Sequence, residues 1–187
     1  EDILNSIKHT PNKASGPSGT SVILFKKFSW LLAPILTRIA NNIAKNGEVN
    51  EFLLQGNISL IPKKKESFYV SDLRPITLLE IPSKIITKVF TEKFKCVLIK
   101  ENFISPNQFC HPNRNIHDNV FCLQLLIKNS KDKNENLHAT FLDFAKAFDY
   151  VDHLYIEKVL KISNFGENFI RFILSMLKGK RRINFNG

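Results

Sequence analysis

Three carboxylates lie close together near the end of the chain, at Asp143, Asp149 and Asp152. Asp143 directly follows the apolar run of residues 139–142, which is typical of a buried strand. A carboxylate at the end of a strand can reach a cation or a substrate, whereas a buried carboxylate without a partner is costly. The spacing therefore predicts either a metal site at Asp143 or a structural role. In the structural alternative, Asp143 caps a helix that starts near residue 145, and the other two carboxylates cap the following turn.

The elements that must position these residues belong to one domain or to part of a larger one. The chain has 187 residues, of which 43% are apolar, and this is enough for a hydrophobic core. Its net charge of +10 predicts a polyanionic partner, with nucleic acid preferred over an anionic membrane surface. The basic residues cluster at 63–65 and at 178–182, which favours this interpretation over a generally soluble surface.

The cysteines Cys96, Cys110 and Cys122 have neither the spacing of a zinc site nor the even number of a disulfide framework. No segment has the roughly 18 apolar residues of a membrane span, and the first residues do not form a signal peptide. We therefore expect an intracellular protein of the nucleus or the cytoplasm, with no membrane partner. The chain lacks an initiator Met and stops after Asn186 and Gly187, so we expect an excerpt of a longer protein.

Apolar periodicity predicts a helix-rich chain with few strands. The expected helices cover about residues 3–10, 21–46, 82–100, 116–128, 152–164 and 167–179. Pro34 should kink the second helix or split it, and Gly47 should end it. Residues 57–62 are expected to form a strand that Pro62 ends, and another strand should begin near residue 182.

Residues 142–151 read Leu-Asp-Phe-Ala-Lys-Ala-Phe-Asp-Tyr-Val. This stretch resembles the first catalytic motif of reverse transcriptases, specifically those of non-LTR (LINE-type) retrotransposons. The resemblance implies that Asp143 is a catalytic carboxylate that holds two magnesium ions, with manganese as the alternative metal. It also implies that the backbone carbonyl of Phe144 is a further ligand, and that the ring of Phe148 lies beneath the incoming sugar. The alternative for Phe148 is a place in the core, which is the commoner position of a Phe.

A second resemblance lies earlier in the chain, where Ile-Pro-Lys-Lys at residues 61–64 is followed by Arg-Pro-Ile-Thr-Leu-Leu at residues 74–79. In LINE-type polymerases this pattern belongs to a hairpin of the fingers. It implies that Arg74, with Lys63 or Lys64, meets the triphosphate of the incoming nucleotide. A guanidinium can bind phosphate oxygens in a bidentate manner, which suits Arg74 to this role. The alternative for the lysines is a solvated turn.

Two further stretches are similar to the same family. Residues 13–19 resemble its Lys-x-x-Gly-Pro-Asp-Gly loop, with Ser18 in place of the Asp. Gln108 and Arg114 match the ends of its Gln-x-Gly-Phe-x-x-x-Arg pattern, although the Gly-Phe pair is absent and the loop is one residue shorter. The resemblance implies that Lys13, Gln108 and Arg114 contact nucleic acid.

The sequence thus predicts an α+β fold, the fingers and partial palm of a right-hand polymerase. Residues 1–138 would form the fingers and early palm, and residues 139–187 the palm with the first catalytic motif, ending before the remaining palm motifs. The implied activity is RNA-directed DNA polymerisation by two-metal phosphoryl transfer. The implied partners are an RNA template, a DNA primer and deoxynucleoside triphosphates, and the excerpt alone is expected to be inactive.

Two other classes of function stay open at this point. One is a nucleic-acid-binding remnant of such an element without catalytic activity, which the basic charge would suit. The other is a metal-dependent nuclease that uses the same acidic stretch. Two adjacent aspartates on a hairpin beyond Gly187 would favour the polymerase.

Overall fold

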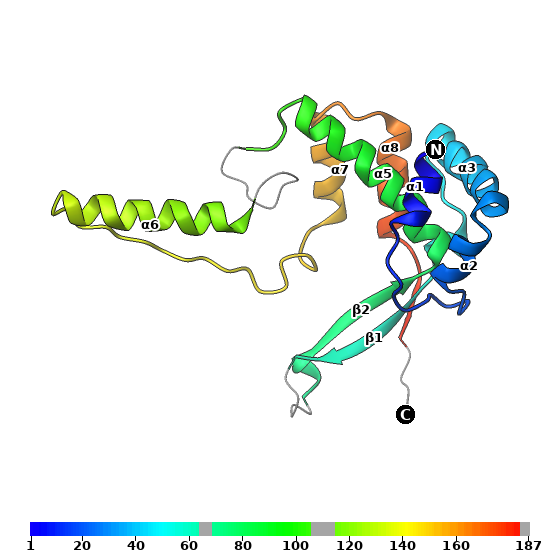
Figure 1. Cartoon of the computed structure of the whole chain (residues 1–187), viewed down its shortest axis with the longest axis horizontal. Helices are drawn as coiled ribbons and strands as arrows, with labels where there is room; N and C mark the ends of the chain where they lie inside the picture. Colours follow the sequence, from blue (N-terminus) through cyan, green and yellow to red (C-terminus); the bar gives the residue numbers. More distant parts are fainter. Residues whose placement is uncertain (64–68, 106–114, 184–187) are drawn as a thin grey trace. The chain divides into compact units, whose positions relative to one another are not determined.

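The structure is a computed structural model that describes residues 1–63, 69–105 and 115–183 (Figure 1). The elements in chain order are α1 (Asp2–Lys8), α2 (Val22–Lys27), α3 (Ser29–Asn46), α4 (Glu51–Leu54), β1 (Gly56–Pro62), the 3₁₀ turn η1 (Val70–Asp72), β2 (Leu73–Leu79), α5 (Ile81–Lys100), α6 (Ile116–Asp132), α7 (His153–Ile162), α8 (Glu167–Leu177) and β3 (Arg181–Ile183). Helices with one small sheet confirm the predicted helix-rich α+β class.

Packing divides the chain into two compact units, which are described separately. The first unit comprises Glu1–Phe90 and Val151–Gly187, and the second comprises Thr91–Tyr150. Packing units of this kind do not define fingers and palm, so the boundary expected near residue 138 stays a prediction. Within the described residues, no helix is both long and apolar enough to cross a membrane.

The first unit has a hydrophobic core where α1, α2, α3 and α4 meet α8 and the beginning of α5. Its buried residues are Ile3, Ile7, Val22, Phe25, Ala33, Leu36, Ala40, Ile43, Leu53, Ile81, Ile85, Ile86 and Phe172. A hydrogen bond 2.9 Å long from the Ser6 hydroxyl to the Ile85 carbonyl also joins α1 to α5. The helical periodicity that predicted these elements from sequence therefore reflects burial against one shared core.

The helix predicted over residues 21–46 is split, but at a different residue from the one expected. α2 ends at Lys27 and α3 begins at Ser29, with Phe28 between them, whereas Pro34 lies inside α3. Pro34 is in the second turn of α3, and it has no N–H to donate to the carbonyl four residues earlier. It therefore removes one hydrogen bond from the helix without ending it.

α3 ends at Gly47, as predicted, and the position requires glycine for two reasons. Gly47 has a left-handed backbone with φ of 71°, and its N–H donates to the Ile43 carbonyl at 2.7 Å. A Cβ atom at this position would also overlap the backbone of Asn168 in α8. The side-chain amide of Asn168 in turn donates to the Lys45 carbonyl at 2.6 Å, so the end of α3 is held against the start of α8.

The sheet has the strand order β2-β1-β3, and its longest part is the hairpin of β1 and β2 (Figure 1). These two strands are antiparallel and pair Gly56 with Leu79 at one end and Pro62 with Leu73 at the other. β1 ends at Pro62, as predicted. β3 lies parallel to β1 and begins at Arg181, close to the expected residue 182. The end of the chain at residues 184–187 lies outside the described part.

The second unit contains the end of α5, the helix α6 and the segment that leads to Tyr150. α6 begins with a capping box formed by Asn115 and Asp118, so local hydrogen bonds define its start. It has no buried residue, although its sequence is rich in apolar side chains. At its end, the hydroxyl of Ser130 donates to the carbonyl of Glu135. α6 is thus a helix whose start is set by local hydrogen bonds and whose apolar side chains are not buried among the described residues.

Candidate functional site

The segment that precedes Asp143 is not the buried strand that the sequence predicts. Residues 139–144 form no strand, and Phe141 and Leu142 are 81% and 85% exposed. A strand is stable only when a neighbour pairs with its backbone N–H and C=O groups. Among the described residues no segment pairs with this one. The apolar run at residues 139–142 is therefore exposed and unpaired within the described part of the chain.

The helix-cap alternative is correct for Asp152 and wrong for Asp143. The Asp152 carboxylate accepts a hydrogen bond of 3.0 Å from the Leu154 N–H and so caps α7. Asp143 precedes turns at residues 145–150, where no helix begins. In the part of the chain that the structure describes, its carboxylate is exposed and accepts no hydrogen bond. Of the two roles weighed from the sequence, the one that leaves Asp143 free for a cation agrees with this geometry.

The two phenylalanines that follow Asp143, at positions 144 and 148, are both exposed. Phe144 is 79% exposed and Phe148 is 96% exposed, so the alternative that placed Phe148 in the core does not describe this structure. Phe148 lies in a turn that is closed by hydrogen bonds from the N–H groups of Asp149 and Tyr150 to the carbonyl of Lys146. Lys146 has a φ of 50°. This turn places Phe148 on the surface of the same segment as Asp143.

The hairpin of the first unit carries Arg74 in β2, and Lys63 directly follows β1. Arg74 lies opposite Ile61 in the register, and the N–H of Lys63 donates to the carbonyl of Asp72 at 2.8 Å. Lys63 and Arg74 therefore lie close in sequence to the same end of the hairpin, one directly after β1 and the other near the start of β2. The Arg74 guanidinium is exposed and bonds to no described residue. Lys64 lies outside the described residues.

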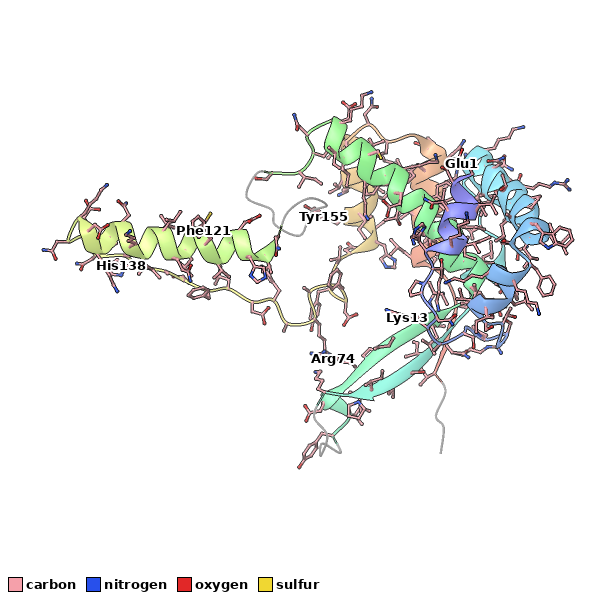
Figure 2. All side chains as sticks on the ribbon, viewed as in Figure 1. Glu1, Lys13, Arg74, Phe121, His138 and Tyr155 are labelled. Atoms are coloured by element: carbon pink, nitrogen blue, oxygen red, sulfur yellow. The ribbon has the colours of Figure 1, made fainter. Side chains whose placement is uncertain are left out.

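The glycine-containing loop of residues 12–20 lies against the base of this hairpin. Figure 2 shows Lys13 on this loop and Arg74 farther along the hairpin. Ser18 makes two contacts with Glu80, the residue between β2 and α5. Its N–H donates to Oε1 at 2.7 Å, and its hydroxyl donates to Oε2 at 2.6 Å. Only 1% of Glu80 is exposed, and sequence reasoning did not identify this residue. The signal was present, since a carboxylate between Leu79 and Ile81 interrupts an apolar run and needs a partner.

Two lysines of α5 also bind the segment that contains this loop. The ammonium group of Lys84 donates to the Ala14 carbonyl at 2.9 Å, and that of Lys88 donates to the His9 carbonyl at 2.9 Å. Burial lowers the pKa of Lys84, the Glu80 carboxylate opposes this shift, and the charge of Lys13 adds to it. Lys13 and Lys84 are therefore close enough to interact electrostatically at the edge of the loop.

The metal-binding potential of the site depends on Asp143. No group of three or more His, Cys, Asp or Glu side chains in the described residues could hold an ion. The carboxylate of Asp143 and the carbonyl of Phe144 are hard oxygen donors of the kind that Mg²⁺ prefers. The chemistry of these two oxygens suits the metal, but they supply only part of its coordination shell. Gln108 and Arg114, two of the expected nucleic-acid contacts, lie outside the described residues.

Two comparisons relate the chain to known proteins. Residues 61–187 match the family described as reverse transcriptase (RNA-dependent DNA polymerase). The chain is also similar to the uncharacterized 149 kDa protein of transposon TX1 from Xenopus laevis, with 32% identity over 178 residues. The match covers 94% of this chain and 14% of that relative, so the chain spans a small part of its length.

Proposed function

Because this chain belongs to the reverse transcriptase family, we propose that it is part of an RNA-directed DNA polymerase encoded by a retrotransposon. The polymerase would add deoxynucleotides to a DNA primer along an RNA template. The observation that carries this proposal is the exposed carboxylate of Asp143, which lies inside the family match and is not used as a helix cap.

Asp143 and Phe144 would hold the divalent metal through a carboxylate and a backbone carbonyl. When bound, two magnesium ions would lower the pKa of the primer hydroxyl and offset charge on the triphosphate. The contribution of the chain is to keep the Asp143 carboxylate exposed and accessible to the metal.

Arg74 would bind the triphosphate of the incoming nucleotide. Its guanidinium can make two parallel hydrogen bonds to phosphate oxygens, and it lies exposed on one face of the hairpin. Lys63 follows the paired strand at the same end of the hairpin and would add a second positive charge. Such groups stabilise the negative charge that develops on the departing pyrophosphate. Lys64 is proposed for the same role.

Phe148 would select deoxynucleotides by excluding the 2′-hydroxyl of a ribose. Specificity of this kind comes from a clash with the competitor, and it needs a ring that can reach the substrate. The exposure of Phe148 is compatible with that role. Lys13, Gln108 and Arg114 are proposed to contact the template or the primer, in line with the net charge of +10.

The first test replaces Asp143 with Asn in the complete polymerase. Asp143→Asn keeps the shape of the side chain and removes the charge that binds metal, so primer extension should fall by several orders of magnitude. Affinity for primer-template should change little, because basic side chains dominate it. The measurements are extension of a labelled DNA primer on an RNA template and the dissociation constant of the same complex.

Asp132→Asn provides the matched control for this test. Asp132 is also exposed and belongs to the same packing unit, at the end of α6. This variant should extend the primer normally. Normal extension by Asp143→Asn would contradict the catalytic role. Metal-dependent cleavage of the primer-template without extension would favour the nuclease alternative.

A further inference from the structure

Glu80 is a buried carboxylate at the junction of the hairpin and a long helix. It follows Leu79, the last residue of β2, and precedes Ile81, the first residue of α5. Its carbonyl accepts the first hydrogen bond of the helix, from the Lys84 N–H at 3.0 Å. A carboxylate at this end of a helix is favoured by the helix dipole, but its burial requires hydrogen-bond donors.

Ser18 supplies those donors from the loop of residues 12–20. Its N–H and its hydroxyl reach the two oxygens of Glu80 at 2.7 and 2.6 Å. The hydroxyls of Ser18 and Thr20 lie 2.9 Å apart. Because Ser18 has a single hydroxyl proton and a carboxylate can only accept, the Thr20 hydroxyl donates to Ser18. Both oxygens of the buried group are thereby satisfied by one residue of the loop.

The backbone of the loop is shaped to make this contact. Gly16 packs so closely that a Cβ atom would lie 2.6 Å from the nitrogen and 2.7 Å from the Cα of Glu80. The N–H of Gly19 donates to the Gly16 carbonyl at 3.0 Å, which closes a turn around Pro17 and Ser18. Lys84 holds the preceding part of the loop through the Ala14 carbonyl. The loop is thus fixed at Ala14, Gly16 and Ser18.

The hydrogen bonds of Glu80 join the loop to the hairpin, and both segments carry residues that we propose to bind substrate. Lys13 precedes the first fixed position of the loop, and Arg74 lies on the strand that ends at Leu79. We propose that Glu80 is a positioning residue, which holds the loop through Ser18 so that Lys13 is presented to nucleic acid in a fixed place relative to the hairpin. This inference rests on the proposed function and adds a residue that acts on binding through Lys13.

The negative charge of Glu80 makes it possible to distinguish a positioning role from a purely electrostatic effect on nucleic-acid binding. If Glu80 acted as a negative charge alone, its removal should tighten the binding of a polyanion. If it acts through the loop, Glu80→Ala should weaken binding because Lys13 is no longer held. The two accounts therefore predict opposite signs for one substitution.

The experiment measures the dissociation constant of the complete polymerase for a primer-template over a series of salt concentrations. Glu80→Ala should lower the slope of log affinity against log salt by about one, as should Lys13→Ala. The double variant should bind no more weakly than Lys13→Ala alone. Glu80→Gln removes the same charge but can accept from the Ser18 N–H and donate to its hydroxyl, so it should restore binding.

Glu92→Ala is the charge control, because Glu92 lies exposed on α5 and pairs with Lys95 at 3.0 Å. It should not lower the affinity. If Glu80→Ala does not fold, Ser18→Ala replaces it, since this change is uncharged and lies in the loop. Equal affinity of Glu80→Ala and Glu80→Gln, or additive effects with Lys13→Ala, would overturn the inference. An affinity of the unchanged protein that does not depend on salt would contradict the proposed function and the inference together.

Discussion

Asp143 and Asp152 are the same residue type in one acidic stretch, yet their surroundings give them different roles. Asp152 accepts the Leu154 N–H and stabilises the start of α7, an interaction that typically contributes about 1 kcal/mol. Asp143 lies nine residues earlier in the sequence and has no such donor among the described residues. A carboxylate that a helix already uses has less capacity to bind metal, so the absence of a cap at Asp143 is relevant to catalysis.

The exposed ring of Phe148 allows a test of sugar selection. Phe148→Val in the complete polymerase should raise ribonucleotide incorporation relative to deoxynucleotide incorporation by roughly tenfold or more, equivalent to about 1.4 kcal/mol. The fold should persist, because the ring is almost entirely exposed and its truncation removes little buried area. The measurement is the ratio of kcat/KM for the two nucleotide types.

Phe141→Val is the control for this substitution. Phe141 is also an exposed aromatic residue of the same segment, but it precedes Asp143. Its replacement should leave the ratio unchanged. An unchanged ratio in Phe148→Val, or an equal change in both variants, would show that Phe148 does not contact the sugar.

Among the secondary-structure elements, local sequence signals account for the helices better than for the strand predicted before Asp143. α6 has a capping box at its first turn and forms without a single buried residue. The run at residues 139–142 has equally clear apolar character, but a strand obtains its hydrogen bonds from another segment. A helix satisfies its backbone within itself, which explains why the helical predictions were confirmed and this strand was not.

The junction of α3 and α8 gives a prediction about stability. Gly47→Ala should lower the free energy of unfolding by more than Gly19→Ala, because both glycines have a left-handed backbone, with φ of 71° and 72°, but only Gly47 faces another element. The left-handed conformation itself costs an alanine roughly 1 kcal/mol. Urea unfolding of the two variants isolates the additional cost of the contact with Asn168.

Equal destabilisation of the two glycine variants would contradict this account. It would mean that α8 can move away from α3 without loss of stability. The space around Gly19 is open within 4 Å, so its variant measures the backbone effect alone.

For the whole molecule, we expect nucleic-acid binding to be separable from catalytic activity. A polypeptide of residues 1–187 has a net charge of +10 and should bind primer-template with an affinity that falls steeply as salt rises. It should not extend the primer, because two-metal chemistry needs several carboxylates and its described residues offer no cluster of metal ligands. Filter binding and primer extension at several salt concentrations measure both properties.

Either of two results would contradict this expectation. Primer extension by the 187-residue polypeptide would show that its own side chains complete a metal site. Binding that does not change with salt would argue against contacts to phosphate groups. Asp143→Asn in the same polypeptide should retain the binding, since this residue is not one of the basic contacts.

The family and most of the elements could be predicted from the amino-acid sequence, because both depend on residues that are near one another in the chain. The motif at residues 142–151 and the pair of stretches around Lys63 and Arg74 are local patterns, as are the helical periodicity and the signals at Pro62 and Gly47. Only the tertiary structure decided that Glu80 is buried against Ser18, which is 62 residues away in sequence. It also decided that Asp152 rather than Asp143 caps a helix, and that the long helix divides at Phe28. The burial of Glu80 depends on which distant groups pack together, and the free energy of that packing is not contained in any short segment. The cap and the helix division are local features, but the residue patterns alone did not decide between neighbouring positions.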